Sequence, residues 1–220
     1  MIASNLITYD IPPLKVTDTG TKALDWMEEF KTTSLPVVSN NKYIGLINES
    51  DILDRNDSDE IIETYNLTFK KPLGYQNQHL FEIISIMAEN DITVLPVADV
   101  NEQYIGIITS ETIIKEFAKT VSINNLGSII TLEVNLRDYS LAEIAKIVES
   151  DDAKILSSFI TSHTDSNKLE VTLKINKTDI SRILHTFERF SYVVTASYNE
   201  TEYHKDLKDR YEEFMRFLNP

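Results

Sequence analysis

Leu35-Pro36-Val37-Val38 and, after four intervening residues, Tyr43-Ile44-Gly45-Leu46-Ile47 each occur a second time in this chain. They return as Leu95-Pro96-Val97-Ala98 and Tyr104-Ile105-Gly106-Ile107-Ile108, displaced by 60 and 61 positions. The connection between the two segments is therefore one residue longer in the second copy. Register matches of this length indicate an internal duplication, and the duplicated unit sets the architecture of the first half.

Each copy predicts the same order of elements around these segments. Apolar residues at helical spacing precede the first segment, as in Ala23, Trp26, Met27 and Phe30. The Leu-Pro pair opens a strand, because proline lacks the N–H that an interior ladder requires. A turn, a second strand and a short helix complete a βαββα unit. A unit of about 55 residues is too small to bury its own sheet face, which favours pairing of the two copies.

These segments, with the stretches Asn48-Glu49-Ser50-Asp51-Ile52 and Thr109-Ser110-Glu111-Thr112-Ile113 after them, resemble the cystathionine β-synthase (CBS) domain family. The resemblance covers repeat 1 over residues 1–65 and repeat 2 over residues 66–120. It implies a pseudo-twofold pair of units that dimerises into a flat disk. It also implies a regulatory role in which adenine nucleotides bind in clefts between the two copies.

Nucleotide recognition in that family is carried by the segment Gly-h-h-Thr/Ser-x-x-Asp, where h is apolar. The first copy keeps the acid as Asp51 but has Asn48 in the hydroxyl position, and the second keeps the hydroxyl as Thr109 but has Thr112 in place of the acid. The resemblance implies that Asp51 holds the ribose and that Asn48 or Thr109 meets phosphate. The alternative is that these residues only cap their helices, which Asn, Thr and first-turn Asp commonly do.

The second half has a different pattern, βαββαβ over residues 127–198, which is the ferredoxin-like plan. Ser140 opens a Ser-x-x-Glu capping box and Thr178 is expected to cap a second helix. After a CBS pair this arrangement resembles an ACT domain and is similar to the CBS–ACT layout of acetoin-utilisation AcuB-type proteins. ACT domains often carry Pro-Gly where this chain has Tyr139-Ser140. We therefore expect the ACT-like domain not to bind a free amino acid.

A terminal amphipathic helix is predicted over residues 199–220. Its apolar residues recur at spacings of four, four, three and four: Tyr203, Leu207, Tyr211, Phe214 and Leu218. A stripe of this kind must be buried. It can pack across a homodimer or dock on its own ACT-like domain, and the sequence leaves both open.

Composition excludes several classes of function. The 220 residues carry a formal net charge of −14, which opposes nucleic-acid binding, and contain no cysteine, so thiolate metal sites and cysteine nucleophiles are absent. No signal peptide or run long enough for a membrane span is visible, so we expect a cytoplasmic protein with no membrane partner. The histidines and the acidic run over residues 49–60 lack metal-ligand spacing.

The resulting prediction is an α+β protein with tandem CBS repeats, an ACT-like domain and no catalytic residues, metal or cofactor. The first hypothesis is a regulatory module whose possible ligand is AMP, ADP or ATP and which acts on an unknown protein partner or on its own oligomeric state. The second is an interaction module with degenerate sites that binds no small molecule. An enzyme with dispersed catalytic residues is the third, although no nucleophile and base share a motif spacing.

Overall fold

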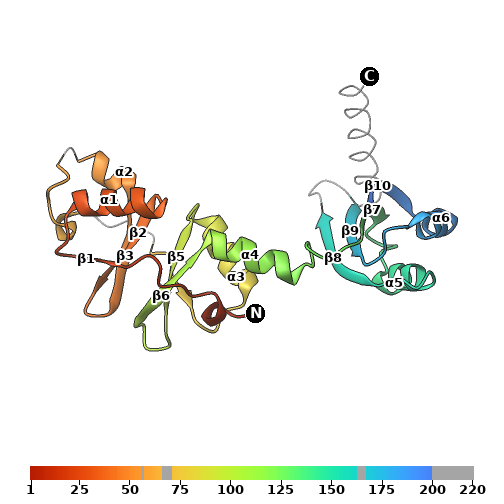
Figure 1. Ribbon diagram of the computed structural model, residues 1–220, viewed down its shortest axis with the longest axis horizontal. Coiled ribbons are helices and arrows are strands. Elements are labelled where there is room, and N and C mark those ends of the chain that lie inside the picture. Colours follow the sequence, from red (N-terminus) through yellow and green to blue (C-terminus); the bar gives the residue numbers. More distant parts are fainter. Residues whose placement is uncertain (56, 66–70, 163–166, 200–220) are drawn as a thin grey trace, which may run out of the picture. The chain divides into compact units, whose positions relative to one another are not determined.

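The computed structural model describes residues 1–55, 57–65, 71–162 and 167–199. The chain divides into two compact units, Met1–Phe117 and Ala118–Pro220, which are described separately below. Figure 1 shows an α+β arrangement in both: two small sheets with helices in the first unit, and one larger sheet with two helices in the second. The predicted fold class is confirmed.

The first copy forms the predicted βαββα unit. Its elements are β1 (Leu14–Lys15), α1 (Gly20–Phe30), β2 (Ser34–Ser39), β3 (Lys42–Asn48) and α2 (Glu49–Leu53). The sheet order is β1-β2-β3, with β1 parallel and β3 antiparallel to β2. Ala23 and Met27 of α1 are buried against this sheet, while Trp26 and Phe30 are half-buried at its margin, as the helical spacing predicts.

The second copy repeats the unit element by element. Its elements are β4 (Gly74–Tyr75), α3 (Leu80–Glu89), β5 (Val94–Ala98), β6 (Tyr104–Thr109) and α4 (Ser110–Thr120). The sheet order β4-β5-β6 has the same strand directions, and a register shift follows Val97 as one follows Val37 in the first copy. The duplication read from the sequence is therefore a duplication of structure.

The two hairpins differ where the second copy has its extra residue. Asn40 and Asn41 close the β2–β3 hairpin with φ angles of 48° and 62°, the left-handed conformation that a tight two-residue turn needs. In the longer β5–β6 loop, one carboxylate oxygen of Asp99 accepts hydrogen bonds from the N–H groups of Asn101 and Gln103, both at 2.8 Å. A side chain thus organises the loop that the extra residue lengthens.

Each copy is completed by a segment that precedes the other copy in the sequence. We call these segments the first strap (residues 1–8) and the second strap (residues 58–65). In the first strap, a short 3-10 turn at Ala3–Asn5 bonds to the second copy: Ala3 N–H donates to Gln78 O at 2.8 Å and Ser4 N–H to Gln76 O at 2.9 Å. Ala3 and Leu6 lie in the core of the second copy.

The second strap repeats these contacts on the first copy. Its 3-10 turn, Ile62–Thr64, bonds through Ile62 N–H to Asp18 O at 2.8 Å and through Glu63 N–H to Val16 O at 2.9 Å. Ile62 and Tyr65 lie in the core of the first copy. Each strap therefore packs on one copy and leads in the sequence into the other. This exchange joins the two copies into one body.

Direct contacts between the copies add to the straps. Val94 and Ile107 of the second copy belong to the same buried cluster as Leu35 and Ile47 of the first. The hairpins meet where Tyr104 N–H donates to Asn41 O at 2.8 Å. The first unit consequently has a core that neither copy could form alone.

The second unit has the predicted βαββαβ order. Its elements are β7 (Ser128–Asn135), α5 (Leu141–Glu149), β8 (Ile155–Ser162), β9 (Lys168–Ile175), α6 (Ser181–Arg189) and β10 (Val193–Asn199). All neighbours in the sheet β10-β7-β9-β8 are antiparallel, and both helices bury their apolar faces against it. This is the ferredoxin-like topology.

Two helix starts in this unit differ from the prediction. Thr178 does not cap α6: the helix begins at Ser181, whose N–H donates to the Asp179 carboxylate at 3.1 Å, and Ile180 occupies the N-cap position. Ser140 does cap α5 by accepting from Glu143 N–H at 3.3 Å. In the predicted capping box the Glu143 carboxylate would also accept from the Ser140 N–H. It accepts a hydrogen bond from the Tyr192 hydroxyl instead. The terminal helix predicted over residues 199–220 lies outside the described residues, apart from Asn199 at the end of β10.

Candidate functional site

The first candidate site is the start of α2 in copy one. Asn48 occupies the N-cap, and Oδ2 of Asp51 accepts hydrogen bonds from both the Asn48 N–H at 2.9 Å and the Asn48 side-chain amide at 3.0 Å. Both residues are half-buried. The sequence-predicted pair is thus brought together, and its geometry fixes the rotamer of the one acid at the family's ribose position.

The corresponding residues of copy two also bond to each other. Thr109 accepts from Thr112 N–H at 3.2 Å, and the two hydroxyls lie 3.0 Å apart. A threonine pair can share one hydrogen bond and remain neutral, whereas a ribose diol is best held by a charged acceptor. The two sites are therefore chemically unequal, as the sequence indicates.

A residue that the sequence analysis did not select lies beside the first pair. Ser34, only 2% exposed, is the register partner of Asn48 across the β2–β3 ladder, so the two side chains share one face of the sheet. Its hydroxyl is one of two buried side-chain oxygens, with that of Tyr43, that have no hydrogen-bond partner among the described residues. The equivalent position in copy two is the apolar Val94, paired with Thr109. Comparing the copies strand by strand would have revealed this difference.

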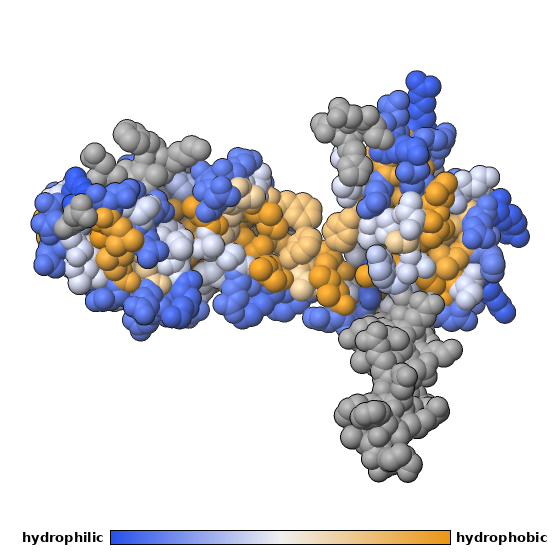
Figure 2. All heavy atoms as spheres, turned by 90° about the horizontal axis from the view of Figure 1, so that it is seen from above, coloured by the Kyte–Doolittle hydropathy of each residue, from blue (hydrophilic) through white to orange (hydrophobic). Residues whose placement is uncertain are grey.

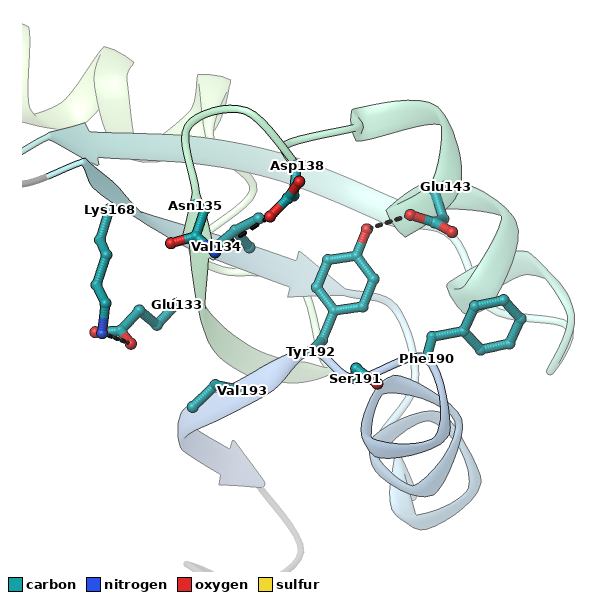
Figure 3. A pocket seen from close by; sticks show the side chains of 10 residues that line it. All are labelled: Glu133, Val134, Asn135, Asp138, Glu143, Lys168, Phe190, Ser191, Tyr192 and Val193. Atoms are coloured by element: carbon teal, nitrogen blue, oxygen red, sulfur yellow. Dashed lines mark hydrogen bonds and ion pairs between the residues drawn. The ribbon is translucent and has the colours of Figure 1, made fainter.

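A cavity of about 390 Å³ lies in the second unit, where the β7–α5 loop meets the start of β10. Figure 3 shows its walls, which carry three acids and a single lysine among polar, aromatic and aliphatic side chains. The lining residues that carry charge are Glu133, Asp138, Glu143 and Lys168. Lys168 already forms an ion pair with Glu133 at 2.5 Å, and Asp138 accepts from the Asn135 amide at 3.1 Å.

Tyr192 lines this cavity and donates its hydroxyl to the Glu143 carboxylate at 2.7 Å (Figure 3). Burial, together with the hydrogen bond and charge of Glu143, raises the pKa of Tyr192 to about 12. The phenol therefore stays protonated at neutral pH and remains the donor in its hydrogen bond to the Glu143 carboxylate. A ligand carboxylate entering this cavity would meet three acids and a lysine that is already paired.

Tyr139, which the sequence comparison with ACT domains singled out, does not line this cavity. It packs instead against the core of the unit, and the lining side chains include neither Tyr139 nor Ser140. The negative charge of the walls supplies a different reason for the same expectation.

Two features are absent from the described residues. None of their helices is both long and apolar enough to cross a membrane. No group of three or more histidine, aspartate or glutamate side chains in this part of the chain is placed to hold a metal ion.

The intertwined βαββα copies, each with its motif at the start of the last helix, define a class of paired βαββα modules. The CBS domain family model matches residues 3–57 and 75–119, which are the two copies. The first unit is therefore a CBS domain pair. The match extends to residue 3 and so includes most of the first strap.

The chain also resembles two curated archaeal proteins. It is 31% identical over 117 residues to homoserine O-acetyltransferase of Methanococcus vannielii, covering 51% of this chain and 24% of that enzyme. It is 23% identical over 138 residues to an uncharacterised protein of Methanocaldococcus jannaschii, covering 61% of this chain and 52% of that protein. The chain thus spans about half the length of one relative and a quarter of the other.

Solved structures similar to the chain include CBS proteins of several kinds. One is a CBS domain pair/ACT domain protein of Thermotoga maritima, at 19% identity and a TM-score of 0.48, covering 54% of this chain and 98% of that one. Another is CBSX2 in complex with AMP, at 20% identity and a TM-score of 0.45, covering 54% and 96% respectively.

Proposed function

We propose that this protein is a non-catalytic regulatory module whose CBS pair binds an adenine nucleotide in the cleft of copy one. The observation that carries the proposal is the buried Ser34 hydroxyl, which has no hydrogen-bond partner among the described residues and lies on the same sheet face as Asn48. An unsatisfied buried hydroxyl costs about 1–3 kcal/mol, and a polar ligand that bonds to it removes that cost. Copy two has a valine there and offers no such gain.

Asp51 supplies the second part of the proposed site. Its Oδ2 is engaged by Asn48, whereas its Oδ1 accepts no hydrogen bond from the described residues. A carboxylate offers about four lone-pair positions, so a ribose diol can be added without breaking the existing bonds. Asn48 would then face phosphate in this cleft and Thr109 in the second, while Thr112 replaces the acid with a neutral group.

Charge sets the expected order of ligands. With a net charge of −14, the protein opposes ATP more strongly than AMP. We therefore propose weak, unequal binding in which the less charged nucleotides or their magnesium complexes are preferred. Binding would act on an unknown protein partner or on a homodimer of this cytoplasmic protein.

Thermal unfolding with AMP, ADP, ATP and S-adenosylmethionine in parallel tests this proposal, because a ligand specific for the folded state raises the midpoint. A concentration-dependent rise with an adenine nucleotide is expected, and no rise with any of the four would contradict it. The proposal also assigns no catalysis. Turnover of ATP that survives repurification and disappears in a point mutant would overturn that part.

A second candidate function is an interaction module that binds no small molecule. The observation in its favour is that the motif side chains satisfy one another in both copies, Asn48 with Asp51 and Thr109 with Thr112. For the ACT-like domain we propose that it binds no free amino acid. Saturable heat from a common amino acid in titration calorimetry would show that to be wrong.

A further inference from the structure

A second hollow of the second unit lies between its two helices and differs in chemistry from the acidic cavity. This groove, of about 430 Å³, is lined by side chains of α5 and α6 and by Phe190 directly after α6. Its apolar walls are Ala142, Ile147 and Phe190, and its two cations are Lys146 and Arg189, one from each helix. The volume lies within the range of about 300–1,000 Å³ that is usual for small-molecule sites.

The cations of the groove have no acidic partner in the part of the chain that the structure describes. Two neighbouring acids are engaged elsewhere, Glu143 with Tyr192 at 2.7 Å and Glu149 with Lys154 at 2.9 Å, and the Glu188 carboxylate lies 3.4 Å from His185 Nδ1. Here Lys146 and Arg189 are left beside an apolar wall.

The other polar groups of the groove do not compete for this role. The Ser150 hydroxyl donates to Ile147 O at 2.7 Å and the Thr186 hydroxyl donates to Arg182 O at 2.8 Å. The single hydrogen of each hydroxyl is therefore already used in a hydrogen bond. The strong donors left for a ligand are the ammonium of Lys146 and the guanidinium of Arg189. Glu143, which also lines the groove, is turned to the Tyr192 hydroxyl on the acidic side.

We propose that the α5–α6 groove binds a small amphipathic carboxylate, which is a site beyond the nucleotide cleft of the CBS pair. The ligand's carboxylate lies between Lys146 and Arg189, and its hydrocarbon part lies on Ala142, Ile147 and Phe190. Charge complementarity selects an anion, and the apolar wall selects one with a hydrocarbon chain over a bare ion such as acetate. The same groove discriminates against amines of equal size.

Titration calorimetry of the full chain with octanoate tests the proposal, with octylammonium and acetate as matched probes. Octanoate is expected to bind saturably, and the two other probes at least tenfold more weakly. Arg189→Gln and Lys146→Gln should each weaken octanoate binding about tenfold, the loss expected for a charged hydrogen-bond partner. Raising the salt concentration should weaken it further, because both cations are exposed.

Three further variants make the result specific. Arg182→Gln removes an exposed arginine of the same helix outside the groove and should leave octanoate affinity unchanged. Ala142→Trp places a large side chain at an exposed position of the groove wall and should abolish binding without disturbing the core. Asp51→Ala should also leave it unchanged, which separates this site from the nucleotide cleft.

Several outcomes would overturn the proposal. These are absence of saturable octanoate binding, equal binding of octylammonium, or unchanged affinity in both the Lys146 and Arg189 variants. Dissociation of an oligomer by Arg189→Gln in light scattering, without octanoate binding to the wild type, would assign the groove to a second copy of the chain and would also overturn it.

Discussion

At the scale of single residues, a substitution of Ser34 distinguishes a binding role from a structural role. The two roles predict changes of opposite sign in the free energy of unfolding. Ser34→Ala removes a buried hydroxyl without a described partner, so the free energy of unfolding should stay constant or rise by about 1 kcal/mol. The midpoint shift caused by AMP should nevertheless become smaller. Calorimetric unfolding with and without AMP measures both quantities. A variant that is less stable alone but responds fully to AMP would refute the assignment.

Asp51 gives a second prediction at this scale. Asp51→Ala should lower AMP affinity by roughly ten- to a hundredfold, whereas Thr109→Ala should leave the stronger site intact. Because Asp51 also accepts from the Asn48 N–H, Asp51→Asn is the matched variant that can keep a cap acceptor while losing the charge. Titration calorimetry with AMP measures the affinity of each of the three variants. Normal affinity in Asp51→Ala together with loss in Thr109→Ala would mean that the other cleft is occupied.

The carboxylate of Asp18 makes the stability of the folded protein depend on pH. Burial alone would raise the pKa of Asp18, but the hydrogen bond and charge of Lys22, 2.8 Å away, and the Lys15 N–H hold that pKa below its ordinary value. A lowered pKa in the folded state adds stability that is present above the unfolded pKa of about 3.9 and is lost as the pH falls through the lower folded value.

Asp18→Asn tests this link. The substitution keeps an acceptor for Lys15 N–H, as Gln78 does for Tyr75 N–H in copy two, and removes only the charge. Since the Lys22 side chain is 41% exposed, we expect a loss of only about 0.5–1 kcal/mol at pH 7. The difference between variant and wild type in urea unfolding should vanish near pH 2. A difference that persists there would show that the charge is not its cause.

At the scale of elements, the first strap depends on one glycine of β6. Gly106 has a φ of +147°, and a Cβ placed on it would lie 2.5 Å from Ile7 Cγ2 in the strap. Gly106→Ala should therefore cost about 1–3 kcal/mol through strain and displacement of the strap. Gly74→Ala is the control, because its nearest contacts, at 3.0 and 3.1 Å, are the ends of flexible leucine and isoleucine side chains. Equal denaturant midpoints for the two variants would contradict this account.

The elements also show what the sequence can and cannot reveal. The strands and helices of the two copies can be predicted from hydrophobic periodicity and from the repeat, because both signals lie within the sequence of each copy. The exchange of the straps could not be predicted this way, because the contacts of Ala3 and Ile62 join residues far apart in the sequence. The Thr178 prediction was wrong since Asp179, one residue closer to the helix, also has a side chain that can accept from its first N–H groups.

The residues of the candidate site also differ in whether the sequence alone reveals them. Asn48, Asp51, Thr109 and Thr112 are visible as motif positions because each pair lies within one helical turn. Ser34 was missed, since it reaches Asn48 only through the β2–β3 register. Tyr192 was missed in the same way, because it lies just before β10 and meets Glu143 from 49 positions later in the sequence.

At the scale of the whole molecule, we expect a homodimer. Apolar side chains reach the surface in the space-filling view (Figure 2), and in the first unit Leu53, Phe81 and Ile114 are 57%, 58% and 68% exposed. Ile114 borders a hollow of about 400 Å³ between α3 and α4. Ile114→Glu should shift the protein to a monomer in light scattering at micromolar concentration, and Val100→Glu in the exposed β5–β6 loop should not. A monomeric wild type would rule the dimer out.

The exchanged straps bear on how a signal could pass through the first unit. Melting copy one would release Ile62 and Tyr65, and melting copy two would release Ala3 and Leu6, so unfolding of either copy disturbs the segments that join them. The two copies should consequently unfold in a single cooperative transition. A nucleotide held by copy one alone would then raise the population of folded copy two as well, and the message would be carried by shared thermodynamic stability without any movement of one copy against the other.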